Sequence, residues 1–429
     1  MNVSDSELVE SLLIKEGYQP TTKINEASLL FINTCSIREH AEDKVHSQLG
    51  RFNLLKRNNP GIIIGVLGCM AQSLKHDILE NKSYVDIVLG PDSYRKLPEL
   101  LKRHELDNKS LVDTKLSKFE VYDNLFPNRK NGVNAWVTIM RGCDKFCSFC
   151  IVPFTRGRER SRSIDGIVNE VKSAVKNGFS EVTLLGQNVN SYGRDLKIDN
   201  RRTPYFAKLL TQLNEIDGLE RIRFTSPHPK DFKEETILAV KNLDKVCNQI
   251  HAPLQSGSSK LLAKMHRGYN KERYIQKIDM IKSILPDVSL TTDIIVGFPG
   301  ETDEDFNDTM DIVNYSEFDS IYMFQFSPRP GTAAYNMESE FINKDIISER
   351  FQYLKDVQTD ISSRKLKRFV GTTQSILIEK ESKKNDAIFT GKIDSGQITH
   401  INKTGLSVGD LVNVNIVDST PFFLKAELI

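Results

Sequence analysis

Residues 135–150 of this chain read AWVTIMRGCDKFCSFC. The run AWVTIM is apolar and predicts a buried strand, and the glycine after it predicts the turn that ends the strand. Three cysteines follow at C-x3-C-x2-C spacing: Cys143, Cys147 and Cys150. An isolated cysteine is usually just buried, but three thiolates this close together favour a soft metal or an iron–sulfur cluster. Zinc would need a fourth ligand at a similar spacing, and none stands close by in the sequence.

The pattern of a strand followed by a helix repeats after this stretch. About six apolar runs predict strands, at 135–140, 181–186, 221–226, 248–254, 289–297 and 320–326. Helical patterns separate these runs, so we predict a partial (β/α)6 barrel rather than a full TIM barrel. Active sites in such folds lie at the carboxyl ends of the strands, and the three cysteines follow the first strand at that position.

Residues 1–105 also alternate helical and strand patterns. Short apolar runs at 28–34, 61–68 and 85–90 are separated by helical segments, which predicts a parallel sheet in an N-terminal α/β domain. The chain begins on a helical segment, so we expect this domain to lack its first strand. Residues 106–132 are polar and irregular and predict a linker.

The C-terminal part changes character. A long polar helix is predicted at 343–368, and short strands divided by Gly, Asn, Asp and Ser follow over 369–429. About five such strands predict a small all-β barrel. The fold class is therefore α/β with a C-terminal all-β unit, and the predicted domains are 1–115, 129–365 and 366–429.

Composition excludes several classes of protein. An apolar fraction of 39% and a charged fraction of 27% are typical of a globular chain, and no run of 18 apolar residues predicts a membrane span. The first residues carry no basic region before an apolar stretch, so no secretory signal is predicted. A net charge of +1 argues against nonspecific coating of nucleic acid, and six cysteines are too few for a disulfide scaffold. We expect a cytoplasmic monomer.

Three cysteines on a cubane iron–sulfur cluster leave one iron open. The amine and carboxylate of S-adenosylmethionine (SAM) could chelate that iron, and the cluster would then deliver one electron into the sulfonium. Cleavage of SAM would yield a carbon radical able to attack an unactivated C–H bond. The missing fourth ligand is therefore the catalytic vacancy that Cys143, Cys147 and Cys150 create. This spacing after the first strand of a partial barrel resembles the radical SAM enzymes.

Several stretches together narrow the resemblance. They are NTCSIREHAEDK (33–44), LGCMAQ (67–72), IMRGCDKFCSFCIVPFTRGRERSRS (139–163), TLLGQNVNSYG (183–193), FTSPHPKDF (224–232), PLQSGS (253–258) and TTDIIVGFPGET (291–302). Across essentially the whole chain the sequence resembles the MiaB-type tRNA methylthiotransferases, and the C-terminal barrel is similar to their TRAM domain. The resemblance implies methylthiolation at C2 of N6-isopentenyladenosine, at position 37 of tRNA.

The same resemblance implies SAM and two 4Fe–4S clusters as cofactors. Cys35 and Cys69 match two ligands of a second, auxiliary cluster in the N-terminal domain, and the third ligand is expected upstream of Met1. One SAM would methylate a sulfur carried on the auxiliary cluster, and a second SAM would be cleaved at the other cluster. Electrons would come from a donor such as flavodoxin or ferredoxin, and a sulfur source would restore the consumed sulfur. Implied SAM contacts are Gly186, Gln187, Asn188, Ser226, Gln255, Asp293 and Gly297.

Two basic stretches suggest RNA contacts. FTRGRERSR places Arg156, Arg158, Arg160 and Arg162 directly after the cysteines, and guanidinium groups match phosphate oxygens. A solvated surface segment, with Glu159 offsetting some charge, is the alternative. A second stretch before the barrel supplies Arg364, Lys365, Lys367 and Arg368. The resemblance implies that the barrel itself grips tRNA.

Other functions remain open at this point. Within the family, the substrate could be threonylcarbamoyladenosine of tRNA or a ribosomal protein. If the chain is truncated, it could be a noncatalytic RNA-binding iron–sulfur protein. Phe146, Phe149 and Phe154 flank the cysteines, where an aromatic side chain is more often pocket packing than a stacking platform for a base. Cys247 has no partner motif and is predicted to be buried.

Overall fold

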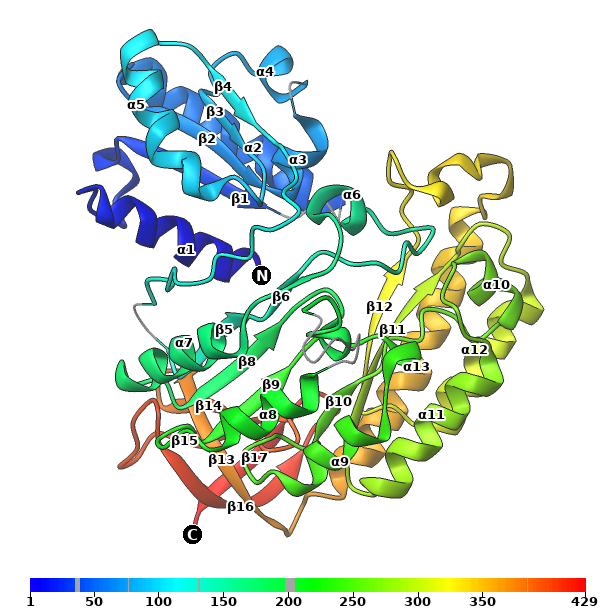
Figure 1. Ribbon diagram of the computed structural model, residues 1–429. Helices are drawn as coiled ribbons and strands as arrows, with labels where there is room; N and C mark the ends of the chain where they lie inside the picture. Colours follow the sequence, from blue (N-terminus) through cyan, green and yellow to red (C-terminus); the bar gives the residue numbers. More distant parts are fainter. Residues whose placement is uncertain (35–38, 76, 130–131, 197–204, 384) are drawn as a thin grey trace. The chain divides into compact units, whose positions relative to one another are not determined.

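The computed structural model describes residues 1–34, 39–75, 77–129, 132–196, 205–383 and 385–429. The chain forms two compact units, and Figure 1 shows their elements. The first comprises Met1–Arg129, Met140–Ser163 and Arg329–Thr332, and the second comprises Lys130–Ile139, Ile164–Pro328 and Ala333–Ile429. The stretch that holds Cys143, Cys147 and Cys150 therefore belongs to the same compact unit as the N-terminal sheet.

The first unit is built on a four-stranded sheet with the order β1-β2-β3-β4, in which every pair is parallel. Its strands are β1 (Leu29–Thr34), β2 (Ile63–Gly68), β3 (Ile87–Leu89) and β4 (Leu111–Asp113). Its helices are α1 (Asn2–Lys15), α2 (Glu39–Asn58), α3 (Cys69–Leu74), α4 (Asp77–Asn81) and α5 (Leu97–Asp107). The predicted parallel α/β domain is confirmed, and its central strands β2 and β3 are wholly buried, as apolar parallel strands should be.

The linker predicted over 106–132 is wrong for its first part. That segment contains β4, which pairs with β3 through Ile87 with Leu111 and Val88 with Val112. A three-residue strand has too few apolar positions to show a period, so only the edge of β3 reveals it. Further along, Tyr122 is buried, and its hydroxyl accepts a hydrogen bond of 2.9 Å from the amide of Tyr94.

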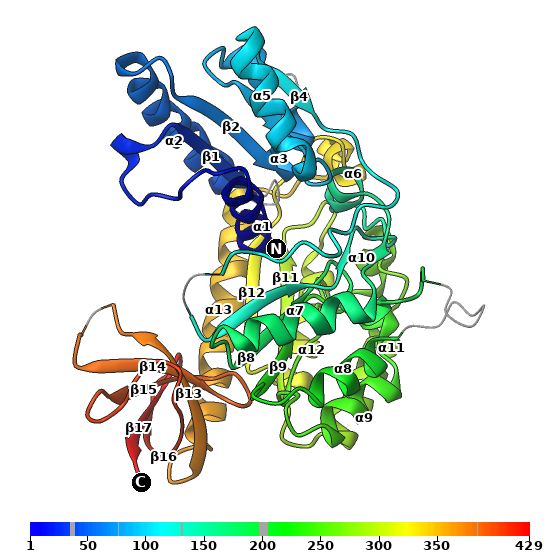
Figure 2. The same cartoon turned by 60° about the vertical axis from the view of Figure 1, so that its left-hand side comes forward.

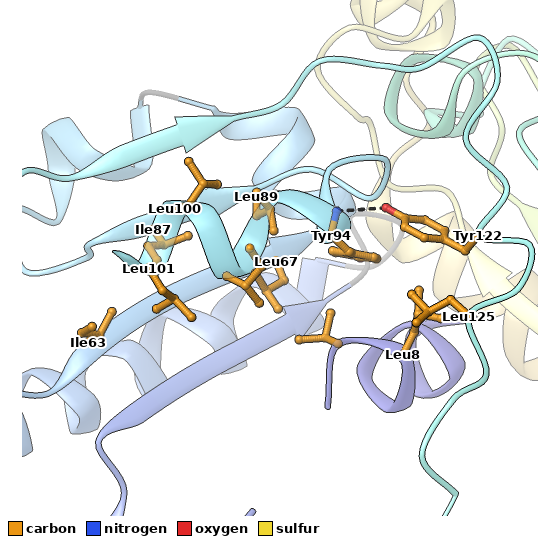
Figure 3. Close-up of a cluster of buried hydrophobic side chains, with 12 residues drawn as sticks. Leu8, Ile63, Leu67, Ile87, Leu89, Tyr94, Leu100, Leu101, Tyr122 and Leu125 are labelled. Carbon is orange, nitrogen blue, oxygen red and sulfur yellow. Dashed lines mark hydrogen bonds between the residues drawn. The ribbon is translucent and has the colours of Figure 1, made fainter. Parts of the chain in front are cut away.

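Two hydrophobic cores lie on the two faces of this sheet. Alternate residues of β2 divide between them, with Ile63 and Leu67 in one core and Ile64 and Val66 in the other. Figure 3 shows the first core, in which Leu8 of α1 lies near Leu125. The segment after β4 thus closes the core rather than crossing solvent.

The second unit contains the six predicted parallel strands. They are β5 (Asn134–Thr138), β8 (Glu181–Leu185), β9 (Arg221–Phe224), β10 (Gln249–His251), β11 (Ser289–Val296) and β12 (Ser320–Gln325). Two ladders, β5-β8-β9 and β10-β11-β12, are connected by a parallel bridge between Ile222 and Val246. The helices of this part are α7 (Ile164–Lys176), α8 (Phe206–Asn214), α9 (Glu234–Asn242), α10 (Ser259–Lys264), α11 (Lys271–Ile284) and α12 (Asp303–Ser316). The partial (β/α)6 barrel is confirmed.

The C-terminal barrel is closed. Helix α13 (Lys344–Lys367) leads into it (Figure 2), and its strand order is β13-β14-β15-β17-β16. The strands are β13 (Thr373–Glu381), β14 (Ile388–Ile393), β15 (Ile398–Asn402), β16 (Leu411–Ser419) and β17 (Leu424–Leu428). Arg221 and Arg223 of β9 donate to carbonyls of this barrel, including Ser375 and Ile393 at 2.8 and 2.9 Å. None of the helices in the described ranges is long and apolar enough to cross a membrane.

Candidate active site

The cysteine loop, residues 142–159, runs between two short antiparallel strands, β6 (Met140–Arg141) and β7 (Arg160–Ser161). Its conformation is set by backbone contacts. Gly142 has a φ of +79°, and a Cβ there would lie 2.0 Å from the carbonyl oxygen of Arg158. The amide of Cys143 donates to the carbonyl of Gly157 at 3.1 Å, and that of Cys150 donates to the carbonyl of Cys147 at 2.9 Å. Helix α6 (Val152–Arg156) lies in the second half of the loop.

The three thiols fit an iron–sulfur cluster better than a single ion. No three Cys, His, Asp or Glu side chains of the described residues are grouped so that they could hold one metal ion. In a cluster each thiolate binds a different iron, so the ligands need not converge on one point. Burial, followed by the charge of Glu159, raises the pKa of Cys143 to about 12. A metal would therefore have to supply the positive charge that makes this thiol a thiolate.

Ser148 supports the same interpretation. This residue lies between Cys147 and Cys150 in the sequence. Its hydroxyl oxygen is buried and has no hydrogen-bond partner within the described residues. A buried hydroxyl without a partner is costly, unless a bound group completes it. A cluster sulfur is an acceptor of the right kind for this hydroxyl.

Cys69 lies in the same unit as the cysteine loop. It is the first residue of α3, directly after β2, and it is buried. The Nε of Arg156, at the end of α6, donates to its Sγ at 3.2 Å. The structure thus places one predicted auxiliary ligand against the segment that follows the other three cysteines. Cys35, the second predicted auxiliary ligand, lies outside the described residues.

Asp5 of α1 pairs with one arginine on each side of the three cysteines. The side chain of Asp5 is 0% exposed, and its two oxygens accept from Arg141 at 2.5 Å and Arg156 at 2.8 Å. Burial by itself would raise the pKa of Asp5, but the two guanidinium groups hold that pKa below its ordinary value. The sequence analysis missed Asp5 and Arg141, because nothing local in the sequence joins residues so far apart along the chain.

Two further arginines hold the strand that follows the loop. Arg160 makes a bidentate pair with Asp92, both contacts being 2.9 Å, and Arg162 pairs with Asp123 at 2.9 Å. Both guanidinium groups are buried, as is that of Arg156. The structure therefore gives Arg156, Arg160 and Arg162 an internal role in place of the predicted phosphate contact, because their aspartate partners come from distant segments of the chain.

Arg158 is the exception among the four arginines. Its side chain is 71% exposed, it pairs with Asp144 at 2.6 Å, and it lies over the ring of Phe146 at 5.5 Å. Phe146 in turn meets Phe154 edge to face, with ring centres 6.4 Å apart, and both rings are exposed. This exposed group offers a cation and two aromatic faces next to the cysteines.

The predicted SAM residues lie at the carboxyl ends of neighbouring strands in the second unit. Gly186 follows β8, Ser226 follows β9, Gln255 follows β10, and Asp293 and Gly297 lie in and directly after β11. The amide of Gln255 donates to the carbonyl of Asp293 at 2.8 Å, and that of Val189 donates to the carbonyl of Ser226 at 3.3 Å. Strand register therefore brings together residues that are far apart in sequence.

Backbone strain marks two of these strand ends. Ser226 has a φ of +58° and Gln255 a φ of +75°, in the left-handed region that residues other than glycine rarely adopt. Such residues gather at ligand-binding sites, where the surrounding structure enforces them. Asp293 also faces His251, whose Nε2 lies 3.3 Å from its Oδ2. Sequence reasoning missed His251, although a period-two pattern along β10 would have placed its side chain on the same face of the sheet as that of Asp293.

Two polar residues occupy the turn after β8. Asn188 is buried and its amide donates to Asp231 at 2.8 Å, whereas Gln187 is half-buried. Gly297 has a φ of +78°, and its amide donates to Glu301 at 3.1 Å. These contacts fix the two turns that the sequence predicted to approach the cofactor.

The second basic stretch lies at the end of α13. Arg364 is exposed and pairs with Glu317 and Asp360, and Lys365 pairs with Asp319 at 2.6 Å. Arg368 lies 3.5 Å from Asp319, and Lys367 is exposed.

Cys247 is buried, as predicted, and burial raises its pKa to about 12.

Comparison with known proteins first defines the class. The chain matches the Radical SAM superfamily over residues 137–313, the Uncharacterized protein family UPF0004 over residues 1–90 and the TRAM domain over residues 367–429. Its fold is similar to that of the radical S-adenosylmethionine methyltransferase TsrM from Kitasatospora setae, with a TM-score of 0.58 at 13% identity over 77% of this chain and 72% of that one. The fold and the cysteine loop are those of a radical SAM protein that carries a TRAM domain.

Full-length relatives then define the family. A tRNA-2-methylthio-N(6)-dimethylallyladenosine synthase from Acetivibrio thermocellus is 43% identical over 100% of this chain and 89% of that protein. The synthase of the same name from Clostridium tetani is 42% identical over 100% of this chain and 94% of that protein. The chain belongs to the tRNA-2-methylthio-N(6)-dimethylallyladenosine synthase family. The MiaB-type resemblance is confirmed.

Proposed function

We propose that this chain transfers a methylthio group to C2 of N6-dimethylallyladenosine, also called N6-isopentenyladenosine, at position 37 of tRNA. The observation that carries this proposal is the cysteine loop with C-x3-C-x2-C spacing in a chain 43% identical to such a synthase over its whole length. The threonylcarbamoyladenosine and noncatalytic alternatives are not favoured, because the full-length relatives bear the dimethylallyladenosine name.

Cys143, Cys147 and Cys150 would hold a 4Fe–4S cluster. When bound, such a cluster supplies the electron that cleaves SAM and so starts radical chemistry. The chain's own contribution is a loop whose backbone is pinned at Gly142 and Gly157, so that the thiols are presented in one arrangement. Pre-ordered ligands lower the entropy cost of binding the cluster.

SAM would bind at the strand ends of the second unit. The contacts are Gly186, Gln187, Asn188, Ser226, Gln255, Asp293 and Gly297. The glycines let a ligand approach the backbone closely, and the carboxylate of Asp293 accepts hydrogen bonds from hydroxyl or amine groups. Because Ser226 and Gln255 already hold strained conformations, the site needs little rearrangement when the cofactor arrives.

A second 4Fe–4S cluster would use Cys35 and Cys69 as ligands. Support comes from the position of Cys69 at the carboxyl end of β2, in the same compact unit as the other three cysteines. Its thiol also has a guanidinium donor, Arg156, as metal-bound sulfurs often do. This cluster would carry the sulfur that is transferred.

The tRNA would meet Arg158, Phe146 and Phe154 near the cysteines. An exposed guanidinium suits phosphate, and exposed rings suit an unstacked base of the anticodon loop. The end of α13, with Arg364, Lys365, Lys367 and Arg368, and the TRAM barrel would contact the body of the tRNA. We also propose a flavodoxin or ferredoxin as electron donor, a separate sulfur source, and a cytoplasmic monomer.

Nucleoside analysis of tRNA tests the function. In a strain that lacks the endogenous synthase, this chain should restore 2-methylthio-N6-isopentenyladenosine, as seen by mass spectrometry. A variant with Cys143, Cys147 and Cys150 all changed to alanine should leave N6-isopentenyladenosine without the methylthio group. Methylthiolation of threonylcarbamoyladenosine instead, or activity in the triple variant, would contradict the proposal.

A further inference from the structure

One histidine of the second unit lies beside a carboxylate that we propose as a SAM contact. His251 belongs to β10, and its Nε2 lies 3.3 Å from Oδ2 of Asp293 in β11. Its Nδ1 lies 3.0 Å from the hydroxyl oxygen of Thr291. Both nitrogens of the ring therefore have a polar partner, and the ring connects the threonine to the carboxylate.

Strand register sets this arrangement, because β10, β11 and β12 lie side by side (Figure 1). His251 is the register partner of Thr291, and Asp293 is that of Tyr322. Residues two apart in a strand share a face, so all four side chains project from one face of the sheet. On that face the rings of His251 and Tyr322 meet edge to face, with centres 5.8 Å apart.

The threonine fixes the role of the histidine. A hydroxyl that donates to Nδ1 leaves the ring proton on Nε2, so the neutral ring donates to the carboxylate of Asp293. A protonated ring would donate from both nitrogens and would still donate to this carboxylate. In either state Oδ2 of Asp293 is occupied as an acceptor.

The second oxygen of Asp293 is left for another donor. Among the described residues, no hydrogen bond reaches Oδ1, and no lysine or arginine pairs with this carboxylate. The side chain is 28% exposed, so a ligand can reach it. The backbone beside it is fixed: the Gln255 amide donates to the Asp293 carbonyl at 2.8 Å, and the Ile295 amide donates to the Gln255 carbonyl at 2.9 Å.

We infer that His251 is a positioning residue for SAM: it holds one oxygen of Asp293 and so presents the other to a hydroxyl or amine of the cofactor. The inference rests on the proposed SAM site. A carboxylate that is fixed before the ligand arrives loses less side-chain freedom on binding, which favours the complex. Because a neutral imidazole carries no charge, the carboxylate keeps its negative charge for the ligand.

Two amide substitutions separate the hydrogen-bond donor from the ring. In His251→Gln the side-chain amide can take the place of Nε2 and donate to Asp293, whereas in His251→Asn the amide takes the place of Nδ1 and is too short to do so. Each full-length variant is reconstituted anaerobically with iron and sulfide, and its dissociation constant for SAM is measured by calorimetry. Urea unfolding of the same samples reports stability.

His400→Asn is the matched control. Nδ1 of His400 in the C-terminal barrel likewise lies 3.0 Å from a threonine hydroxyl, that of Thr390, and its ring lies edge to face against Phe423. No carboxylate pairs with His400 within the part of the chain that the structure describes. The control thus loses the same kind of ring and threonine contact without touching Asp293.

His251→Asn should weaken SAM binding about fivefold, as expected for the loss of one hydrogen bond. His251→Gln and His400→Asn should bind SAM as the unmodified chain does. Equal affinity of His251→Asn and the unmodified chain overturns the inference alone and leaves the SAM site standing. Equal weakening in His251→Asn and His251→Gln also overturns it, because the ring and not the donor would then matter.

A double substitution tests whether His251 acts through Asp293. Asp293→Ala should weaken SAM binding about tenfold, and adding His251→Asn should weaken it no further, since no carboxylate is left to position. A further fivefold loss in the double variant overturns the inference. Full SAM affinity in Asp293→Ala overturns the proposed contact and the role of His251 together, whereas methylthiolation of tRNA is scored separately.

One outcome concerns folding. If His251→Asn does not fold, His251→Phe takes its place, because phenylalanine keeps a ring beside Tyr322 but has no donor. The same fivefold loss of SAM affinity then supports the inference, and an unchanged affinity overturns it.

Discussion

The cysteine loop of the first unit and the strand ends of the second, where we propose that SAM binds, are held in place by different forces. The loop is anchored by buried ion pairs, in which Asp5 and Asp92 hold Arg141, Arg156 and Arg160. The strand ends are held by parallel register, as between Gln255 and Asp293. Backbone register depends on many bonds, whereas each ion pair depends on one carboxylate. Single charge changes should therefore disturb the first region much more than the second.

The largest effect is expected from Asp5→Ala. Removal of the Asp5 carboxylate leaves two buried guanidinium groups without their shared anion, which should destabilise the protein by about 3–5 kcal/mol. Urea unfolding followed by circular dichroism measures the change. The control is Asp144→Ala, because Asp144 pairs with the exposed Arg158 of the same loop and should contribute little. Equal midpoints for the two variants would refute the comparison.

The same carboxylate predicts a pH dependence. The arginines hold the pKa of Asp5 below its ordinary value, so the folded state binds this proton less readily than the unfolded state. Its stabilising contribution is fully present above the ordinary carboxyl pKa of about 4. This contribution is lost as the pH falls through the lower pKa that Asp5 has in the folded protein. Asp5→Ala should therefore lower the stability difference between neutral and acidic pH, and an unchanged pH profile would count against this.

The next effect compares two glycines that share a left-handed conformation. In Gly142→Ala the new methyl would meet the Arg158 carbonyl oxygen at 2.0 Å, whereas in Gly297→Ala it would meet the Ile347 side chain at 2.4 Å. Both pay about 1–3 kcal/mol of backbone strain, but a side chain can move aside more easily than a backbone. Gly142→Ala should lose about half of its iron on reconstitution, the share of the cluster at Cys143, Cys147 and Cys150. Gly297→Ala should retain its iron. Iron counting distinguishes the two.

A smaller effect is expected at Asp293. Asp293→Asn removes a negative charge from a strand end without breaking strand register, so stability should be unchanged. SAM binding should weaken about tenfold, or about 1.4 kcal/mol, as measured by calorimetry on the reconstituted protein. Asp279→Asn, an exposed aspartate of α11, is the matched control. Unfolding of Asp293→Asn would show that this strand end depends on its charge after all.

The smallest effect is expected at Arg158. Arg158→Gln removes an exposed charge that plays no part in the buried pairs, so folding and iron content should not change. The slope of log tRNA affinity against log salt should fall by about 1, since one phosphate contact is lost. Filter binding at several salt concentrations measures this, with the exposed Lys241→Gln of α9 as the control. An unchanged slope would show that Arg158 makes no phosphate contact with the tRNA.

Periodic features of the chain were predictable because they repeat. Apolar periods and turn residues predict three features: the six strand-and-helix units, the five-stranded barrel and the long helix at 344–367. The cysteine loop was predictable because ligand spacing is local. The segment around β4 was missed because three residues are too few to form a pattern.

The arginine-rich stretch shows where sequence reasoning ends. A run of alternating arginines looks like a basic surface, and only the fold shows that three of the four are buried against Asp5, Asp92 and Asp123. Those aspartates come from other segments, and a sequence does not state which distant charges will meet.

Spacing and periodicity are properties of neighbouring residues, so the sequence predicted the order of the domains, the three-cysteine loop and the strand ends where we propose that SAM binds. The fold was needed to show which arginines are buried and that Arg156 reaches Cys69. The physical reason is that a buried guanidinium must find its anion in space, and in this protein those anions lie far away along the chain.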